Sequence, residues 1–307
     1  MNVSVNPMKD LINSGNAKVM MIIAMSLFGT LGVFTYFIDL PASIIVVGRG
    51  LIGAAFLMLM IYLGGSRLSK DDIYGNMFTL ICSGVCLGLN WLFLFEAYKS
   101  IEISVATVLN YMTPALVILI SPLVFKTKLT FTKLGCALLA LLGLVLVTGI
   151  IEDGIENINS YGILCGVMAA VFYTGLVVFN KKLKSIGSYD RTFVQLLIAG
   201  IVIAVYCLFT IDFGTLEVDT TSIVLVVIIA VFQTAIAFTL YFGSLAFLDA
   251  TDAVMYGYIE PVLSLFLSVI ILHEDLGWIG WTGAALILGS TFLSEIISRR
   301  KMRSSVE

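Results

Sequence analysis

The stretch from Ala250 to His273 reads ATDAVMYGYIEPVLSLFLSVIILH, and it decides the fold. It is long and apolar enough to cross a bilayer, because about twenty apolar residues span the hydrocarbon core. It nevertheless contains an acid, Glu260, followed directly by Pro261. A carboxylate in lipid is costly and a proline disturbs a helix, so both are tolerated where a helix faces protein or a wet cavity. Because Tyr256 lies one turn before Glu260, this face is expected to line a pathway for a small molecule.

The whole chain has the composition of an integral membrane protein. Hydrophobic residues make up 60% of its 307 residues and charged residues 12%. Soluble domains carry about twice that charged fraction. Short connections favour one compact all-α bundle in the lipid bilayer. Ten apolar segments are expected, at residues 17–38, 41–64, 74–98, 102–125, 131–151, 161–180, 190–211, 220–243, 250–272 and 277–298.

Lysine and arginine are distributed unequally between alternate loops. With the N-terminus in the cytoplasm, 15 of the 17 basic residues fall in cytoplasmic tails and loops, against Lys99 outside and Arg49 within the membrane. Cytoplasmic loops of membrane proteins carry an excess of lysine and arginine. The distribution therefore predicts an even number of crossings of the cytoplasmic membrane, with both termini in the cytoplasm.

The chain also repeats its own pattern. An odd number of crossings per repeat forces the second copy to be inverted, and inverted repeats around a midplane site are typical of transporters. We therefore predict repeats at residues 17–151 and 161–298 around a central cavity, with tails at residues 1–16 and 299–307. The repeat is seen when the sequence is aligned with itself at a shift of 147 residues. The aligned pairs are Ala106 with Ala253, Tyr111 with Tyr258, Pro114 with Pro261, and Ser121 with Ser268.

Four stretches carry a family resemblance. They are GRGLIGAAFLML around Arg49, NWLFLFEAYKSIEISVATVLNYMTPALVILISPLVF from Asn90 to Phe125, YIEPVLSLFLSVIILHEDL from Tyr258 to Leu276, and GWTGAALILGSTFL at residues 280–293. In these the sequence resembles the ten-helix branch of the drug/metabolite transporter superfamily, whose members have two EamA domains. The resemblance implies a central cavity with alternating access. It also implies small substrates: amino acids, other metabolites, cations and drugs.

One position departs from the family pattern. The family often has an acid after both the fourth and the ninth segments. Here Glu274 occupies the second position, but Thr127, between Lys126 and Lys128, occupies the first. Whatever gate this acid helps to form is therefore expected to be asymmetric, or its role to pass to another residue.

Two charged residues are the leading candidates for a site. Glu260 can bind a cationic group or exchange a proton for it, which would link proton release to substrate binding. Alternatively, it only bonds a tyrosine or a backbone group freed by Pro261. Arg49 can hold a carboxylate with its fork of donors, or it snorkels, caps a helix, or pairs with Glu260 or Glu96. If Arg49 and Glu260 both face the cavity, a zwitterion such as an amino acid satisfies them together.

Other polar and aromatic groups lie at a similar depth. Trp91, Phe95 and Tyr98 form a helical stripe that can stack on a flat or cationic substrate, although plain packing explains the stripe equally well. Glu96, Tyr98 and Lys99 are expected at a solvated rim. Five further residues are open between lining the cavity and bonding a neighbouring helix: Asn90, Asn110, Tyr111, Gln233 and Tyr241.

Several functions find no support in the sequence. The five cysteines lie in apolar segments and the single histidine, His273, lies apart from them, so no metal site is expected. Neither a phosphate-binding G-x-x-x-x-G-K motif nor a basic patch with aromatics occurs, which argues against nucleotides and nucleic acids. An intramembrane enzyme would need converging catalytic groups. A sensor or assembly factor with a degenerate cavity is a further alternative.

The sequence therefore predicts a secondary transporter of small metabolites, without a cofactor and not an enzyme. An amino-acid-like or zwitterionic substrate is the first expectation, with proton coupling left open. An exporter of organic cations or drugs is the alternative. Both a monomer and a homodimer are compatible with this sequence.

Overall fold

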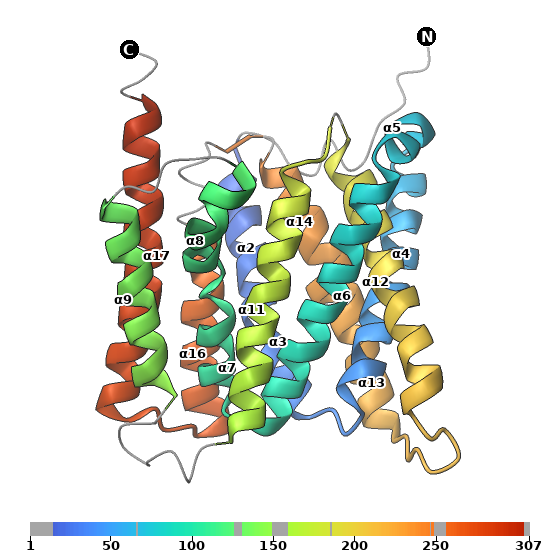
Figure 1. The fold of residues 1–307 in the computed structure, drawn as a ribbon. Helices are drawn as coiled ribbons and strands as arrows, with labels where there is room; N and C mark the ends of the chain where they lie inside the picture. Colours follow the sequence, from blue (N-terminus) through green and yellow to red (C-terminus); the bar gives the residue numbers. More distant parts are fainter. Residues whose placement is uncertain are drawn as a thin grey trace.

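The computed structural model describes residues 15–65, 67–125, 131–148, 159–184, 186–245, 247–248 and 256–303. Within these ranges every regular element is a helix. Figure 1 shows the helices side by side, with the first residues of α2 and the last of α17 both toward the upper end of the bundle. Outside the described ranges lie Thr127 and its two lysines, the tail up to residue 14, residues 149–158, and the start of the ninth segment at residues 249–255.

The elements follow one another along the chain in two groups. The first group is α2 (Ala17–Gly29), α3 (Leu31–Tyr36), α4 (Ala42–Leu63), α5 (Lys70–Gly75), α6 (Met77–Ser100), α7 (Ile103–Asn110), α8 (Thr113–Phe125) and α9 (Phe131–Val147). The second group is α11 (Ser160–Asn180), α12 (Ser188–Thr210), α13 (Thr220–Ala230), the π-helical segment η2 (Val231–Ile236), α14 (Ala237–Leu245), α16 (Ile259–Leu272) and α17 (Gly277–Arg303).

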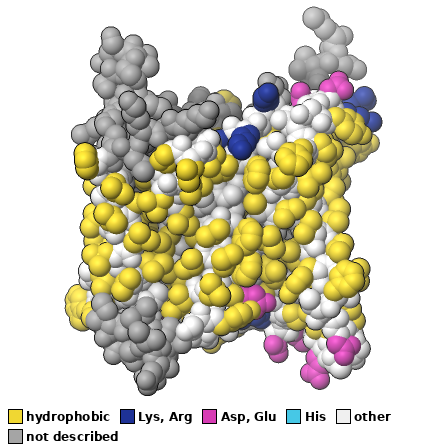
Figure 2. Space-filling model, in the orientation of Figure 1, with side chains coloured by type: hydrophobic (Ala, Val, Ile, Leu, Met, Phe, Trp, Pro, Cys, Tyr) yellow, Lys and Arg dark blue, Asp and Glu magenta, His cyan; other side chains and the backbone are white. Residues whose placement is uncertain are grey.

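The helices have the length and composition of membrane spans. Among the described residues, seven stretches are long and apolar enough to cross a membrane, and two shorter apolar helices accompany them, at Leu134–Val147 and Ile259–Leu272. Hydrophobic side chains cover the middle of the visible face in Figure 2, while lysine and arginine lie toward its upper edge. A multi-pass membrane protein has this distribution, because only apolar side chains are stable against lipid.

Two of the predicted segments are broken helices. The fourth divides at Tyr111 and Met112, between α7 and α8, and the ninth has a turn at Tyr258 before α16 begins. Pro114 and Pro261 consequently lie in the first turn of α8 and of α16. A proline is tolerated there, because its missing N–H would have had no partner within the helix. The break near Glu260 therefore comes before the proline and not at it.

The first and eighth segments are also irregular. Thr30 separates α2 from α3, and η2 lies between α13 and α14. In η2 the Thr234 hydroxyl donates to the carbonyl of Ile229, five residues earlier, at 3.1 Å. Wide turns of this kind are frequent at functional sites. Nothing in the apolar run of residues 220–243 predicts this change of helical pitch.

Glycine permits the closest helix contacts. A Cβ on Gly50 of α4 would lie 2.7 Å from the Cα of Gly200 of α12, and one on Gly143 of α9 would lie 2.7 Å from the carbonyl oxygen of Gly283 of α17. Small residues let helix backbones approach in membranes. The α9–α17 pair stands at one side of the bundle in Figure 1. The largest buried cluster joins α4, α6, α11 and α12, and the polar groups described next lie beside it.

Candidate functional site

Glu260 lies in the first turn of α16 and on its inner face. The same face continues one turn later at buried Ser264, whereas Val262 and Phe266 on the other side of the helix are exposed by 43% and 55%. A Cβ on Gly29 of α2 would lie 2.8 Å from the Glu260 carbonyl oxygen, so α2 covers the start of α16 closely. Glu260 therefore points into the bundle. The first turn of a helix also favours a carboxylate there, because it carries the positive end of the helix dipole.

Four tyrosines lie within electrostatic range of this acid. The Glu260 carboxyl interacts electrostatically with the hydroxyl groups of Tyr98, Tyr111, Tyr173 and Tyr241. They come from α6, the α7–α8 break, α11 and α14, so segments far apart in the sequence converge on one carboxyl. We refer to these four residues as the tyrosine ring. Of the four, Tyr111 and Tyr241 are predicted site residues, and the structure brings both to Glu260.

Tyr173 is the member of the tyrosine ring that the sequence analysis missed. It lies seven residues after Gly166 on α11, hence on the same face, and Gly166 packs against Leu109 of α7. Tyr173 nevertheless remains 40% exposed, and Glu260 and Tyr111 are also partly exposed. Accessible side chains on inward faces indicate that packing around this acid is incomplete. The seven-residue spacing from Gly166 is the signal in the sequence that points to Tyr173.

Arg49 is buried beside this group and is held by two neighbours. Only 3% of its surface is exposed, its Nε donates to Thr234 Oγ1 at 2.8 Å, and its guanidinium lies 3.9 Å from the centre of the Trp91 ring. Such stacking is favourable for a cation over the face of an indole. The guanidinium also interacts electrostatically with Glu260, and its Nη1 has no hydrogen-bond partner among the described residues. The snorkelling alternative is thereby wrong.

Asn90 and Asn110 bond neighbouring helices. The Asn90 side chain donates to Asn110 Oδ1 at 3.0 Å and to the Ala169 carbonyl at 2.9 Å. The Thr113 hydroxyl donates to the Asn110 carbonyl at 2.9 Å, across the α7–α8 break. Breaking a helix frees backbone groups that need partners inside a membrane. The two asparagines and Thr113 therefore stabilise the break, and this answers the alternative left open for the asparagines.

Gln233 and Tyr256 contact other parts of the bundle than the two asparagines do. Gln233 donates to Thr30 Oγ1 at 2.6 Å, and its own Oε1 is buried without a hydrogen-bond partner among the described residues. Tyr256 packs with the buried cluster of α2 and α14. A turn at Tyr258 lies between Tyr256 and Glu260, and α16 includes Glu260 but not Tyr256.

The predicted rim divides into two parts. Lys99 donates to the Ile38 carbonyl at 3.0 Å and Glu96 accepts from the Tyr161 hydroxyl at 3.4 Å, both near the end of α6. Tyr98, in contrast, is only 9% exposed, so it lies deeper than Glu96 and Lys99. Its hydroxyl lies 3.2 Å from Thr107 Oγ1 of α7, which in turn lies 3.2 Å from Ser264 Oγ of α16.

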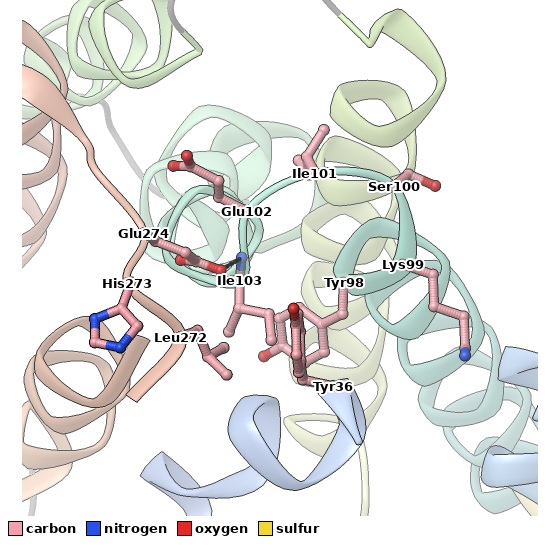
Figure 3. Close-up of a pocket in the computed structure, with 10 residues that line it drawn as sticks. All are labelled: Tyr36, Tyr98, Lys99, Ser100, Ile101, Glu102, Ile103, Leu272, His273 and Glu274. Carbon is pink, nitrogen blue, oxygen red and sulfur yellow. Dashed lines mark hydrogen bonds between the residues drawn. The ribbon is translucent and has the colours of Figure 1, made fainter. Parts of the chain in front are cut away.

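A cavity of about 550 Å³ opens at the lower end of the bundle. Figure 3 shows its lining from the ends of α3, α6 and α16 and the start of α7, with Tyr98 and Ile103 between them. We refer to this cavity as the lower mouth. Tyr98 lines the lower mouth and also lies within electrostatic range of Glu260, so the mouth and this acid have one side chain in common as a neighbour.

The described residues show no metal-binding chemistry. They hold no group of three or more His, Cys, Asp or Glu side chains close enough to bind one ion. The five cysteines are free thiols, three of them buried. The polar centre therefore consists of one arginine, one acid, tyrosines and hydroxyl or amide groups, which are groups that bind organic molecules through charge, hydrogen bonds and stacking.

Apolar helices, two broken spans and a buried charged centre define a class, the multi-pass membrane proteins that carry a polar site within the bundle. Within this class, the chain belongs to the EamA-like transporter family, whose sequence pattern matches residues 16–149 and again residues 160–296. Relatives that align with it over most of their own length are named transporters.

Two relatives and one solved structure illustrate the similarity. "Uncharacterized transporter YxxF" of Bacillus subtilis is 27% identical over 89% of both chains. "Aromatic amino acid exporter YddG" of Escherichia coli is 24% identical over 80% of this chain and 84% of its own. A solved crystal structure matches with a TM-score of 0.63 over 92% of this chain and 99% of its own, at 18% identity, which shows a shared fold alone.

Proposed function

We propose that this protein is a secondary transporter of the cytoplasmic membrane that works by alternating access. In this proposal ten segments form two inverted five-helix repeats around the charged centre, and both termini face the cytoplasm. The concentration of basic residues at the upper end supports this orientation. The absence of a nucleotide-binding motif from the sequence supports gradients of ions or substrate as the source of energy.

We propose an aromatic zwitterion as the substrate. Arg49 Nη1, buried without a partner among the described residues, is the donor for a substrate carboxylate. Glu260 and the tyrosine ring form the opposite subsite, where an ammonium group meets a carboxylate and phenol rings. The single observation that carries the proposal is that opposite charges lie within electrostatic range of one another in one buried centre. The name of the Escherichia coli relative supports the choice of an aromatic side chain.

Export of organic cations is the second candidate. Thr234 and Trp91 already hold Arg49, as a purely structural arginine would be held. In that case Glu260 and the tyrosine ring alone recognise the substrate, and a carboxylate on the ligand adds nothing.

Three matched probes distinguish these candidates: phenylalanine, phenylethylamine, which lacks the carboxylate, and phenylpropionate, which lacks the ammonium group. A ligand that binds only the folded protein raises its melting temperature. We expect phenylalanine to stabilise the purified protein most. Equal stabilisation by phenylethylamine would favour organic cations instead, and stabilisation by none of the three would contradict this site.

Flux measurements test the role of Glu260 directly. In sealed vesicles, Glu260→Gln should reduce transport of the bound probe by about 100-fold, because the ammonium group of the substrate loses its charged partner, which costs about 3 kcal/mol of binding. Glu96→Gln is the matched control, since it removes an acid near the end of α6 that bonds Tyr161. Wild-type flux and pH dependence in Glu260→Gln would remove Glu260 from the site.

A further inference from the structure

Glu274 joins two parts of the chain at the lower mouth. Its Oε1 accepts the backbone N–H of Ile103 at 2.7 Å, and its Oε2 accepts that of Ser104 at 2.9 Å. Figure 3 shows the carboxylate reaching from the end of α16 to the first turn of α7. First-turn amides have no partner within their own helix, so this carboxylate satisfies two of them with charged hydrogen bonds.

A second set of contacts lies deeper along the same boundary. Tyr98, Thr107 and Ser264 link α6, α7 and α16 through two hydroxyl contacts of 3.2 Å. Both sets of contacts join α7 to α16, one at the lower mouth and one toward Glu260. Separating α7 from α16 at this end would break both sets of contacts.

The sequence provides this carboxylate at only one end of the bundle. Under the shift of 147 residues, Glu274 corresponds to Thr127, between two lysines. A threonine hydroxyl carries no charge and cannot bond two amides with two separate oxygens. The sequence therefore offers no carboxylate at the matching position of the first repeat.

We propose that Glu274 is a latch that holds α7 against α16 and so closes the way from the lower mouth to the charged centre. The transporter then rests with this way shut and opens it against the two hydrogen bonds. This inference rests on the proposed function, because a latch needs a pathway to close. In the proposed orientation the lower mouth faces the outside of the cell.

Amide hydrogen exchange of the purified full chain in lipid nanodiscs measures whether the two hydrogen bonds of Glu274 are formed, and it requires no transport. The amides of Ile103 and Ser104 owe their protection to Glu274, so Glu274→Ala should speed their exchange by about tenfold or more. Glu274→Gln keeps one acceptor oxygen and should give an intermediate rate. Asp275→Asn is the matched control, since it removes the same charge from the same loop and should leave both amides slow.

Thiol labelling then tests whether the mouth opens. A cysteine at Ser264, in a chain otherwise free of cysteine, should react with a membrane-impermeant reagent from the lower side several times faster when Glu274 is replaced by alanine or glutamine. Unchanged exchange at residues 103 and 104 in Glu274→Ala, with normal exchange in α6 showing that the protein is folded, would overturn the proposal. Faster exchange without faster labelling would also overturn it, because the carboxylate would then cap α7 without gating.

The outcomes separate the latch from the transport function. If Glu260→Gln abolishes flux while the Glu274 variants change neither exchange nor labelling, the latch falls and the proposed function stands. If the Glu274 variants speed both exchange and labelling but no probe binds or is transported, the latch is supported and the proposed substrate is wrong.

Discussion

The two broken spans, α7–α8 and the ninth segment with α16, share one design and differ at one decisive position. Each has a tyrosine at the break, a proline three residues later and a serine ten residues after the tyrosine. Both serines use their hydroxyls in the same way, Ser121 donating to the Ile118 carbonyl at 2.8 Å and Ser268 to the Leu265 carbonyl at 3.0 Å. Between tyrosine and proline, however, one span has Thr113 and the other has Glu260.

These two residues have opposite environments. Thr113 is 4% exposed, and its hydroxyl contacts the carbonyl oxygens of Asn110 and Ala170 at 2.9 and 3.3 Å. Glu260 is partly exposed and faces phenols and a guanidinium. The same backbone break thus serves two purposes. In one half it is closed by neutral hydrogen bonds, and in the other it presents a charge to the interior.

Replacing each of these two residues by the other tests the difference between the spans, and Thr113→Glu should have the largest effect on stability. Thr113→Glu places a carboxylate beside the carbonyl oxygens of Asn110 and Ala170. Carbonyl oxygens donate no hydrogen bonds, so the charge has no partner there. An unpaired buried charge costs about 3–5 kcal/mol, so we expect a strong fall in melting temperature and in yield of folded protein. Thermal unfolding of purified protein, followed by its intrinsic fluorescence, measures this change.

Glu260→Thr is the reciprocal control. It removes a charge from a polar, partly accessible position, so its melting temperature should stay close to that of the wild-type protein. Equal melting temperatures for Thr113→Glu and the wild type would show that the first break also accommodates a charge, and the two spans would then not differ in the way described.

Part of this difference follows from sequence alone. A proline after Glu260 predicts an interrupted helix, and the shift that pairs Tyr111 with Tyr258 indicates two related spans. Periodicity cannot predict that Thr234 lies in a π-helical turn, because apart from Gln233 every residue around it is apolar or small. The proximity of Tyr173 and Tyr98 to Glu260 could not be predicted, for a different reason. Helical spacing places each tyrosine on a face of its own helix, but it does not report that Glu260, 87 and 162 residues away in the sequence, lies nearby.

A substitution at Thr234 should have the next largest effect on stability. Thr234→Val keeps the shape of the side chain but removes the acceptor for Arg49 Nε. Leaving a buried charged donor without its partner costs about 2–3 kcal/mol, so the variant should melt well below the wild type. If Arg49 binds substrate, the affinity for phenylalanine should also fall, and a titration by thermal shift measures both quantities.

Thr239→Val is the matched control, because Thr239 is also buried and, among the described contacts, its hydroxyl bonds only the Ala235 carbonyl, at 2.7 Å. Losing that bond to its own helix should cost no more than about 1 kcal/mol. Equal destabilisation by the two valines would mean that Thr234 supports its helix and not Arg49.

The smallest effect is expected at the end of α16, just before Glu274. His273 has a φ of 57°, in the left-handed region that glycine adopts without strain. His273→Gly should relieve about 1 kcal/mol of strain and lose about 0.5 kcal/mol to the greater freedom of the unfolded chain, a small net gain in stability. His273→Val should lose about 1–2 kcal/mol, because a β-branched residue fits this φ poorly. Gly277 has the same φ, so Gly277→Ala is the reverse control and should lower the melting temperature. A lower melting temperature for His273→Gly would show that the imidazole itself supports this corner, and the positioning of Glu274 would then depend on a side chain and not on the backbone.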